Sequence, residues 1–125
     1  TTQGVSNSIY GLGVMRVKWN QAPASLRNAI HDVIVQLLHP QRIDARQNSQ
    51  AVANIIYALG LMEAVWHEFP ADVVDTLLHG FVACGDYLKN QELSNLVYGL
   101  GLLRADFHSL PPVFMKSFTT TFVRS

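Results

Sequence analysis

Three segments of the chain share one pattern of polar and apolar positions. They are QGVSNSIYGLG at 3–13, QAVANIIYALG at 50–60 and QELSNLVYGLG at 91–101. Counted from the tyrosine of each segment, a glutamine lies at −7, an asparagine at −3, a leucine at +2 and a glycine at +3. An aromatic residue follows at +9 and a proline at +13. Agreement at so many offsets indicates an internal repeat, with tyrosines 47 and 41 residues apart at positions 10, 57 and 98.

Each repeat is expected to form two helices. The first helix carries the glutamine, asparagine and tyrosine and is expected over about 3–17, 49–64 and 90–104. The second helix opens near the proline, because proline is tolerated in the first turn of a helix. From there, apolar residues recur in four-residue steps, which indicates one buried face: Leu26, Ile30 and Ile34; Val73, Leu77 and Phe81; Phe114, Phe118 and Phe122. Pro40 is expected to end the first of these helices, and HPQRIDARQN at 39–48 to form a polar loop.

Repeats of this length and content are typical of stacked helix pairs. The sequence therefore predicts an all-α fold, an α-solenoid of three helix-turn-helix repeats forming a HEAT- or armadillo-like superhelix. The repeats are expected at about 3–40, 49–88 and 90–125, as one unit that is part of a longer repeat protein.

The glutamine, asparagine and tyrosine positions that recur in the first helix of each repeat fall within roughly 60° of one another around the helix axis. Glycines beside them indicate that a neighbouring backbone approaches closely. Two interpretations remain open: the amides bridge adjacent repeats, or the stripe contacts an extended ligand. The candidate positions are Gln3, Asn7, Tyr10, Gln50, Asn54, Tyr57, Gln91, Asn95 and Tyr98. At +6 the residue differs between repeats, which makes Arg16, Glu63 and Arg104 candidates for specificity.

Composition changes this picture in two ways. Hydrophobic residues make up 49% of the chain and charged residues only 14%, against about 25% in a typical domain, so part of the surface is expected to pack against a partner. The net charge of zero counts against nucleic-acid binding without excluding a local basic patch. A single cysteine allows no internal disulfide and suits a reducing intracellular compartment, organelle or cytosol. No apolar run is long enough to predict a membrane span.

The pattern Q-x-x-x-N-x-x-Y-[GA]-L-G, followed by an aromatic residue and a proline, resembles the octotricopeptide and heptatricopeptide repeats. These repeats occur in organellar RNA-binding proteins, some with a RAP domain, and similar repeats occur in secreted proteins of intracellular bacteria. The resemblance implies an α-solenoid that binds RNA, with the nine glutamine, asparagine and tyrosine positions on its inner surface.

The ligand has two candidates. Single-stranded RNA is favoured by the resemblance, while a peptide or protein partner fits the neutral composition, because asparagine amides of armadillo-type repeats hold extended peptides. Basic residues converging on the stripe would favour RNA: Arg16, Lys18, Lys89 and Arg104. Arg42 and Arg46 in the expected loop are further candidates for phosphate contacts.

No enzyme, metal or cofactor is predicted. The five histidines show no metal-ligand spacing with each other or with the cysteine. Cys84 lies beside an apolar stripe and is expected to be a small core residue. Gly11 and Gly13 lie inside a helical pattern rather than between a strand and a helix, so they form no phosphate-binding loop.

Overall fold

The computed structural model describes residues 1–39 and 41–124. In this part of the chain the secondary structure consists of helices, without strands. The prediction of an all-α fold is confirmed. The α-helices of the described residues are α1 (Thr2–Val14), α2 (Ala24–Leu37), α3 (Ala45–Leu61), α4 (Ala71–Cys84), α5 (Asn90–Leu102) and α6 (Pro112–Arg124). Among them, none combines the length and the hydropathy needed to cross a bilayer.

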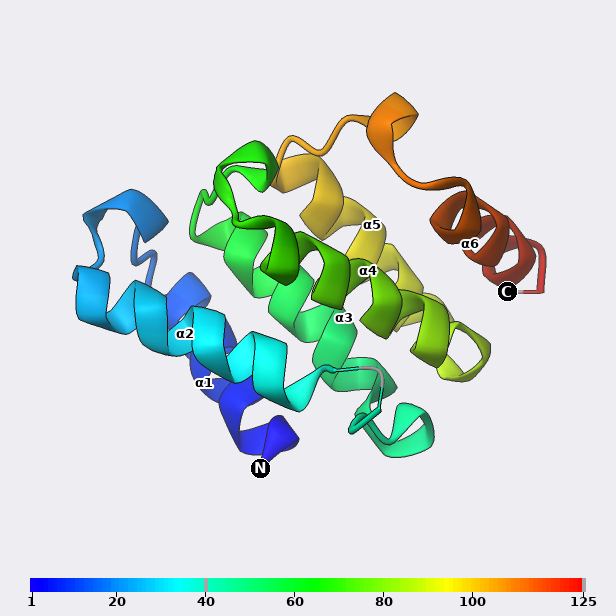
Figure 1. The fold of residues 1–125 in the computed structure, drawn as a ribbon, viewed down its shortest axis with the longest axis horizontal. Helices are drawn as coiled ribbons and strands as arrows, with labels where there is room; N and C mark the ends of the chain where they lie inside the picture. The colour runs from blue at the N-terminus through cyan, green and yellow to red at the C-terminus, as the bar shows by residue number, and fades with distance from the viewer. Residues whose placement is uncertain (40, 125) are drawn as a thin grey trace.

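The helices form two layers (Figure 1). In the first layer α3 lies between α1 and α5 and contacts both, and in the second layer α4 contacts both α2 and α6. The most extensive helix–helix contacts are those within the first layer. We refer to α1–α2, α3–α4 and α5–α6 as the first, second and third helix pairs.

The core is centred on the second pair. Val52, Ile56 and Leu59 of α3 are at most 1% exposed, as are Leu77 and Phe81 of α4. Removing side chains of this size from water contributes about 1.5–3 kcal/mol each. The same offsets are less covered in the third pair, where Val97 is 40% exposed and Phe122 63%. The predicted apolar faces are therefore buried in the middle of the molecule and partly open at its carboxyl end.

The first-layer helices end earlier than expected. They stop at Val14, Leu61 and Leu102 rather than at 17, 64 and 104. The cause is a left-handed residue two positions after each end of the helix proper, with φ of 62° at Arg16, 58° at Glu63 and 59° at Arg104. A right-handed helix cannot continue through that conformation.

Two other boundaries differ from the prediction. Helix α3 begins at Ala45, because the Asp44 side chain accepts a hydrogen bond from Gln47 N at 3.3 Å and caps the helix. The segment expected to be a polar loop is therefore partly helical. Pro40, expected to end the preceding helix, lies outside the described residues. Pro23 and Pro70 precede the first residues of α2 and α4, as the tolerance of helix starts for proline predicts.

A single 3₁₀ turn that the sequence did not predict follows each first-layer helix. These turns are Trp19–Gln21, Trp66–Glu68 and Phe107–Ser109. The aromatic residue at +9 opens each turn, and its environment depends on the pair. Trp66 is 4% exposed and belongs to the core, Trp19 is half-buried against it, and Phe107 is 59% exposed.

Candidate functional site

The three tyrosines of the repeated pattern form a row across the first layer. The ring centroids of Tyr10 and Tyr57 are 6.2 Å apart, and those of Tyr57 and Tyr98 are 6.0 Å apart. Each ring comes from a different helix, so residues 47 and 41 positions apart in sequence meet at one surface. Tyr10 is 36% exposed, Tyr98 62%, and Tyr57 between them is half-buried. We call these residues the tyrosine row.

The amides beside the tyrosine row bond within their own helices. Gln3 Nε2 donates to Asn7 Oδ1 at 3.1 Å, and Gln91 Nε2 donates to Asn95 Oδ1 at the same distance. In the described part of the chain none of the stripe amides bonds to a neighbouring helix pair, so a ladder of amides between repeats does not form. One such bond leaves each amide with further donors and acceptors directed outward.

In the second pair the corresponding amides are Gln50, which is exposed, and Asn54, which is half-buried. The predicted stripe therefore lies on α1, α3 and α5, with its middle tyrosine more covered than those at the two ends, while Asn54 and Asn95 are half-buried and Asn7 is exposed.

The residue at +6 closes each first-layer helix in the same way. Arg16 N donates to Gly13 O at 3.0 Å and Val17 N to Leu12 O at 3.1 Å, and the equivalent bonds recur in the other two pairs. This is the Schellman arrangement, in which the left-handed position is usually glycine. A residue with a Cβ costs roughly 1 kcal/mol there. All three positions nevertheless carry a long, exposed, charged side chain.

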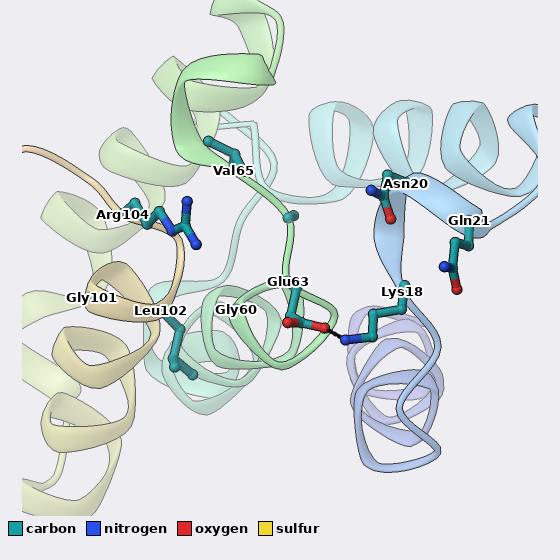
Figure 2. A pocket seen from close by; sticks show the side chains of 10 residues that line it. Lys18, Asn20, Gln21, Gly60, Glu63, Val65, Gly101, Leu102 and Arg104 are labelled. Atoms are coloured by element: carbon teal, nitrogen blue, oxygen red, sulfur yellow. Dashed lines mark ion pairs between the residues drawn. The ribbon is translucent and has the colours of Figure 1, made fainter.

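A groove of about 610 Å³ runs along these helix ends (Figure 2). Lys18 lies on one side of it and Arg104 on the other, with Glu63 between them. The Lys18 ammonium forms an ion pair with the Glu63 carboxylate, joining the first pair to the second. Both partners are exposed, so this ion pair contributes about 0–1 kcal/mol to stability.

Two cations near the carboxyl ends of the first-layer helices have no acidic partner among the described residues. Within the described residues neither Arg16 nor Arg104 takes part in an ion pair, and Figure 2 shows the Arg104 side chain directed into the groove. The basic residues proposed from the sequence are only partly brought together. Arg16, Lys18 and Arg104 gather at the carboxyl ends of the first-layer helices, whereas Lys89 precedes the amino end of α5.

The arginines of the expected loop lie at the same end as Lys89. Arg42 precedes α3, and Arg46 lies in its first turn, where its guanidinium is 5.8 Å from the Tyr87 ring centroid. Neither residue is part of the groove.

Two titratable groups elsewhere in the described chain have shifted pKa values. Cys84 is fully buried, as predicted, and burial together with the Asp44 charge raises the pKa of its thiol to about 11. His31 Nε2 lies 2.9 Å from an Asp72 carboxylate oxygen and links α2 to α4, and this hydrogen bond lowers the pKa of Asp72. No sequence offset indicated this pair. Over the described ranges, no three His, Cys, Asp or Glu side chains converge on a possible metal position.

Comparison of the chain with models of protein families, with curated proteins and with solved structures found no match.

Proposed function

We propose that this chain is a non-enzymatic α-solenoid of three helix-turn-helix repeats that binds single-stranded RNA along its first layer. The solenoid part is supported by contacts that recur from one helix pair to the next. Trp19 N donates to Met62 O at 2.7 Å, and Trp66 N donates to Leu103 O at 2.8 Å. The same offsets meet in both interfaces, which is the property of stacked repeats.

The curvature of such a stack follows from its contacts. The first-layer helices contact one another more extensively than the second-layer helices do. A stack that is tighter on one side curves toward that side, so the tyrosine row and the amides would line the inner surface.

The chemistry of this surface supports RNA as the ligand. Every base has a π-face, and stacking of a base on an aromatic ring is worth about 1–3 kcal/mol. Tyr98 offers the most accessible ring of the row. Outward-directed amides of Gln3 and Gln91 can bond to base edges. Arg16 and Arg104, just beyond the carboxyl ends of α1 and α5, can each take a phosphate in bidentate fashion.

The observation that carries the proposal is the charged residue at each left-handed helix end. Glycine would be the more stable choice at all three positions. Strained backbone that is retained with a particular side chain points to a use for that side chain. Two of the three side chains, Arg16 and Arg104, are unpaired cations at the edge of an aromatic and amide surface.

The direct test is fluorescence anisotropy of a labelled pool of random single-stranded RNA at about 50 and 200 mM salt. Two phosphate contacts predict a slope of log affinity against log salt of about −1.4, hence a roughly sevenfold loss between these conditions. Tyr98→Ala should weaken binding by about 5- to 150-fold if a base stacks on this ring.

Arginine variants separate a local site from general charge. Arg104→Ala should reduce both affinity and salt slope, whereas Arg42→Ala removes the same charge from the opposite helix ends and should leave both unchanged. Folded protein that binds no RNA at either salt, or equal losses in the two variants, would refute RNA binding at this surface.

A peptide or protein is the second candidate ligand, and one observation favours it. Glu63 pairs with Lys18 in the groove, so among the described residues that line it Arg104 is the one cation without an ion pair. Exposed glutamine and asparagine amides also suit the backbone of an extended peptide. Peptide binding that is insensitive to salt but lost in Tyr98→Ala would support this alternative.

A further inference from the structure

Each contact between consecutive helix pairs joins two different groups. The earlier pair contributes a group on the side that faces the carboxyl end of the molecule, and the later pair contributes a different group on the side that faces the amino end. The backbone bond illustrates this: the N–H at +9 of one pair reaches the carbonyl at +5 of the next, as Trp19 reaches Met62 and Trp66 reaches Leu103.

Close helix approach follows the same rule. A Cβ added to Gly13 would lie 3.1 Å from Ala58 O, and one added to Gly60 would lie 3.0 Å from Gly99 O. The glycine at +3 of one pair thus packs on the small residue at +1 of the next. The tyrosine row repeats with the same spacing.

At the carboxyl end of the molecule, the third pair carries the groups with which the first and second pairs contact the pair that follows them. Among the described residues no further pair covers these groups. A Cβ on Gly101 would meet no atom within 4 Å. Among the bonds of the described residues, the Phe107 N–H has no acceptor, although its equivalents Trp19 and Trp66 each have one. Tyr98 is the most exposed of the tyrosine row.

At the amino end, the first pair carries the groups with which the second and third pairs contact the pair that precedes them. A Cβ on Gly11 would also meet no atom within 4 Å. The Met15 carbonyl accepts no hydrogen bond in the described part of the chain, whereas its equivalents Met62 and Leu103 do. Tyr10 is 36% exposed and, among the described residues, has Tyr57 as its one neighbour in the tyrosine row.

Charge provides an independent indication of what covers these ends. Between the first and second pairs, Lys18 at +8 forms an ion pair with Glu63 at +6. The residue at +8 of the third pair is Asp106, and the residue at +6 of the first pair is Arg16. These two end residues are opposite in sign, and neither takes part in an ion pair within the described residues. The carboxyl end of this chain is therefore complementary to its own amino end.

Both ends also carry apolar grooves. At the carboxyl end a groove of about 570 Å³ is lined by Leu93, Val97, Tyr98, Phe118 and Phe122. At the amino end a groove of about 410 Å³ is lined by Val5, Ile9, Leu12, Leu26 and Ile30. Covering such surfaces is favourable by the hydrophobic effect.

We propose that the chain stacks head to tail on a second copy of itself, the first helix pair of one molecule covering the third pair of the other. In this contact Phe107 N donates to the Met15 carbonyl, Asp106 pairs with Arg16, and Tyr98 meets Tyr10. The tyrosine row then continues from one molecule into the next. Because the two surfaces differ, the contact is heterologous and propagates into open-ended assemblies.

Charge reversal tests the pairing. Sedimentation velocity of the 125-residue chain over about 1–300 µM should show species that grow with concentration. Arg16→Asp and Asp106→Arg each place like charges opposite one another and should weaken association about tenfold. The double variant, and an equimolar mixture of the two single variants, restore opposite charges and should restore association.

Steric variants test which ends meet. Gly11→Leu and Gly101→Leu add a side chain where the isolated molecule has open space, so each variant should fold and should be monomeric. Mixed together, they leave one compatible pair of ends and should stop at a dimer. A wild-type chain that stays monomeric throughout, or single charge variants that associate as the wild type does, would overturn the proposal in favour of a partner of different sequence at these ends.

Discussion

Replacing Gly99 by alanine measures how closely α5 approaches α3. The added Cβ would lie 2.8 Å from Tyr57 Cα and 2.9 Å from Ile56 O, and neither backbone atom can rotate away. Helix α5 must therefore shift and loosen the largest interface of the first layer. Overpacking of this kind costs about 1–3 kcal/mol. Alanine regains about 1 kcal/mol of helix propensity, so the net change in unfolding free energy is a loss of about 0–2 kcal/mol.

Gly101→Ala is the matched control for this prediction. It makes the same change two residues further along the same helix, where the Cβ meets no atom within 4 Å. Helix propensity is common to both variants, so the difference between them reports the clash alone, about 1–3 kcal/mol in favour of Gly101→Ala. Urea unfolding followed by circular dichroism, at low protein concentration to avoid self-association, gives both values. Equal stability of the two variants would refute the close approach of α5 to α3.

Three further predictions follow from single sites. Arg104→Gly relieves the left-handed strain and should raise the unfolding free energy by about 1 kcal/mol in a thermal melt, while RNA affinity falls. Burial raises the pKa of Cys84 from 9.0 to about 11, so at pH 8 roughly 1 thiol in 1,000 is ionised against about 1 in 11 at the ordinary value, and reaction with a disulfide reagent should be about 90-fold slower than in the urea-unfolded chain. The folded pKa of Asp72 lies below its usual value of 3.8, so its stabilisation is present above that pH and is lost as pH falls through the folded pKa. Asp72→Asn should therefore be less stable than the wild type at about pH 5, and the difference should shrink as pH falls below 3.8, measured by urea unfolding; a constant difference would contradict the assignment.

The fold class could be predicted from the sequence because the repeated offsets report directly on helix period. Apolar positions in four-residue steps predicted the second-layer helices, and the glycines predicted a close neighbour that Gly13, Gly60 and Gly99 have. The left-handed helix ends could not be predicted, because arginine and glutamate occupy positions where glycine is the usual indication. Local capping by Asp44 likewise lengthened α3 beyond the repeated pattern.

The candidate site was predicted in part for a related reason. Recurrence identified the tyrosine row, since three equal residues at equal offsets must lie on equivalent faces of three helices. Pairings between unlike residues, such as Lys18 with Glu63 or His31 with Asp72, depend on how one pair sits on the next. Which unlike residues meet is decided by how the helices pack, so the spacing of residues within a single repeat does not predict these pairs.

Residues at the same offset from the tyrosine can be compared for burial in the three helix pairs. This comparison separates positions that pack between pairs from positions that stay exposed. At +24 from the tyrosine, Ile34 and Phe81 are at most 1% exposed while Phe122 is 63% exposed, and all three are large and apolar. An apolar residue is retained at this offset whether or not the rest of the chain covers it, which marks the offset as part of a packing face. Covering a side chain such as Phe122 contributes about 1.5–3 kcal/mol toward association. The +6 offset behaves in the opposite way: Arg16, Glu63 and Arg104 are exposed in every pair. The +6 side chains lie at the edge of the contact between helix pairs, where Glu63 forms an ion pair with Lys18. They are accessible both to a neighbouring pair and to the ligand proposed above, whereas the +24 residues are suited to packing alone.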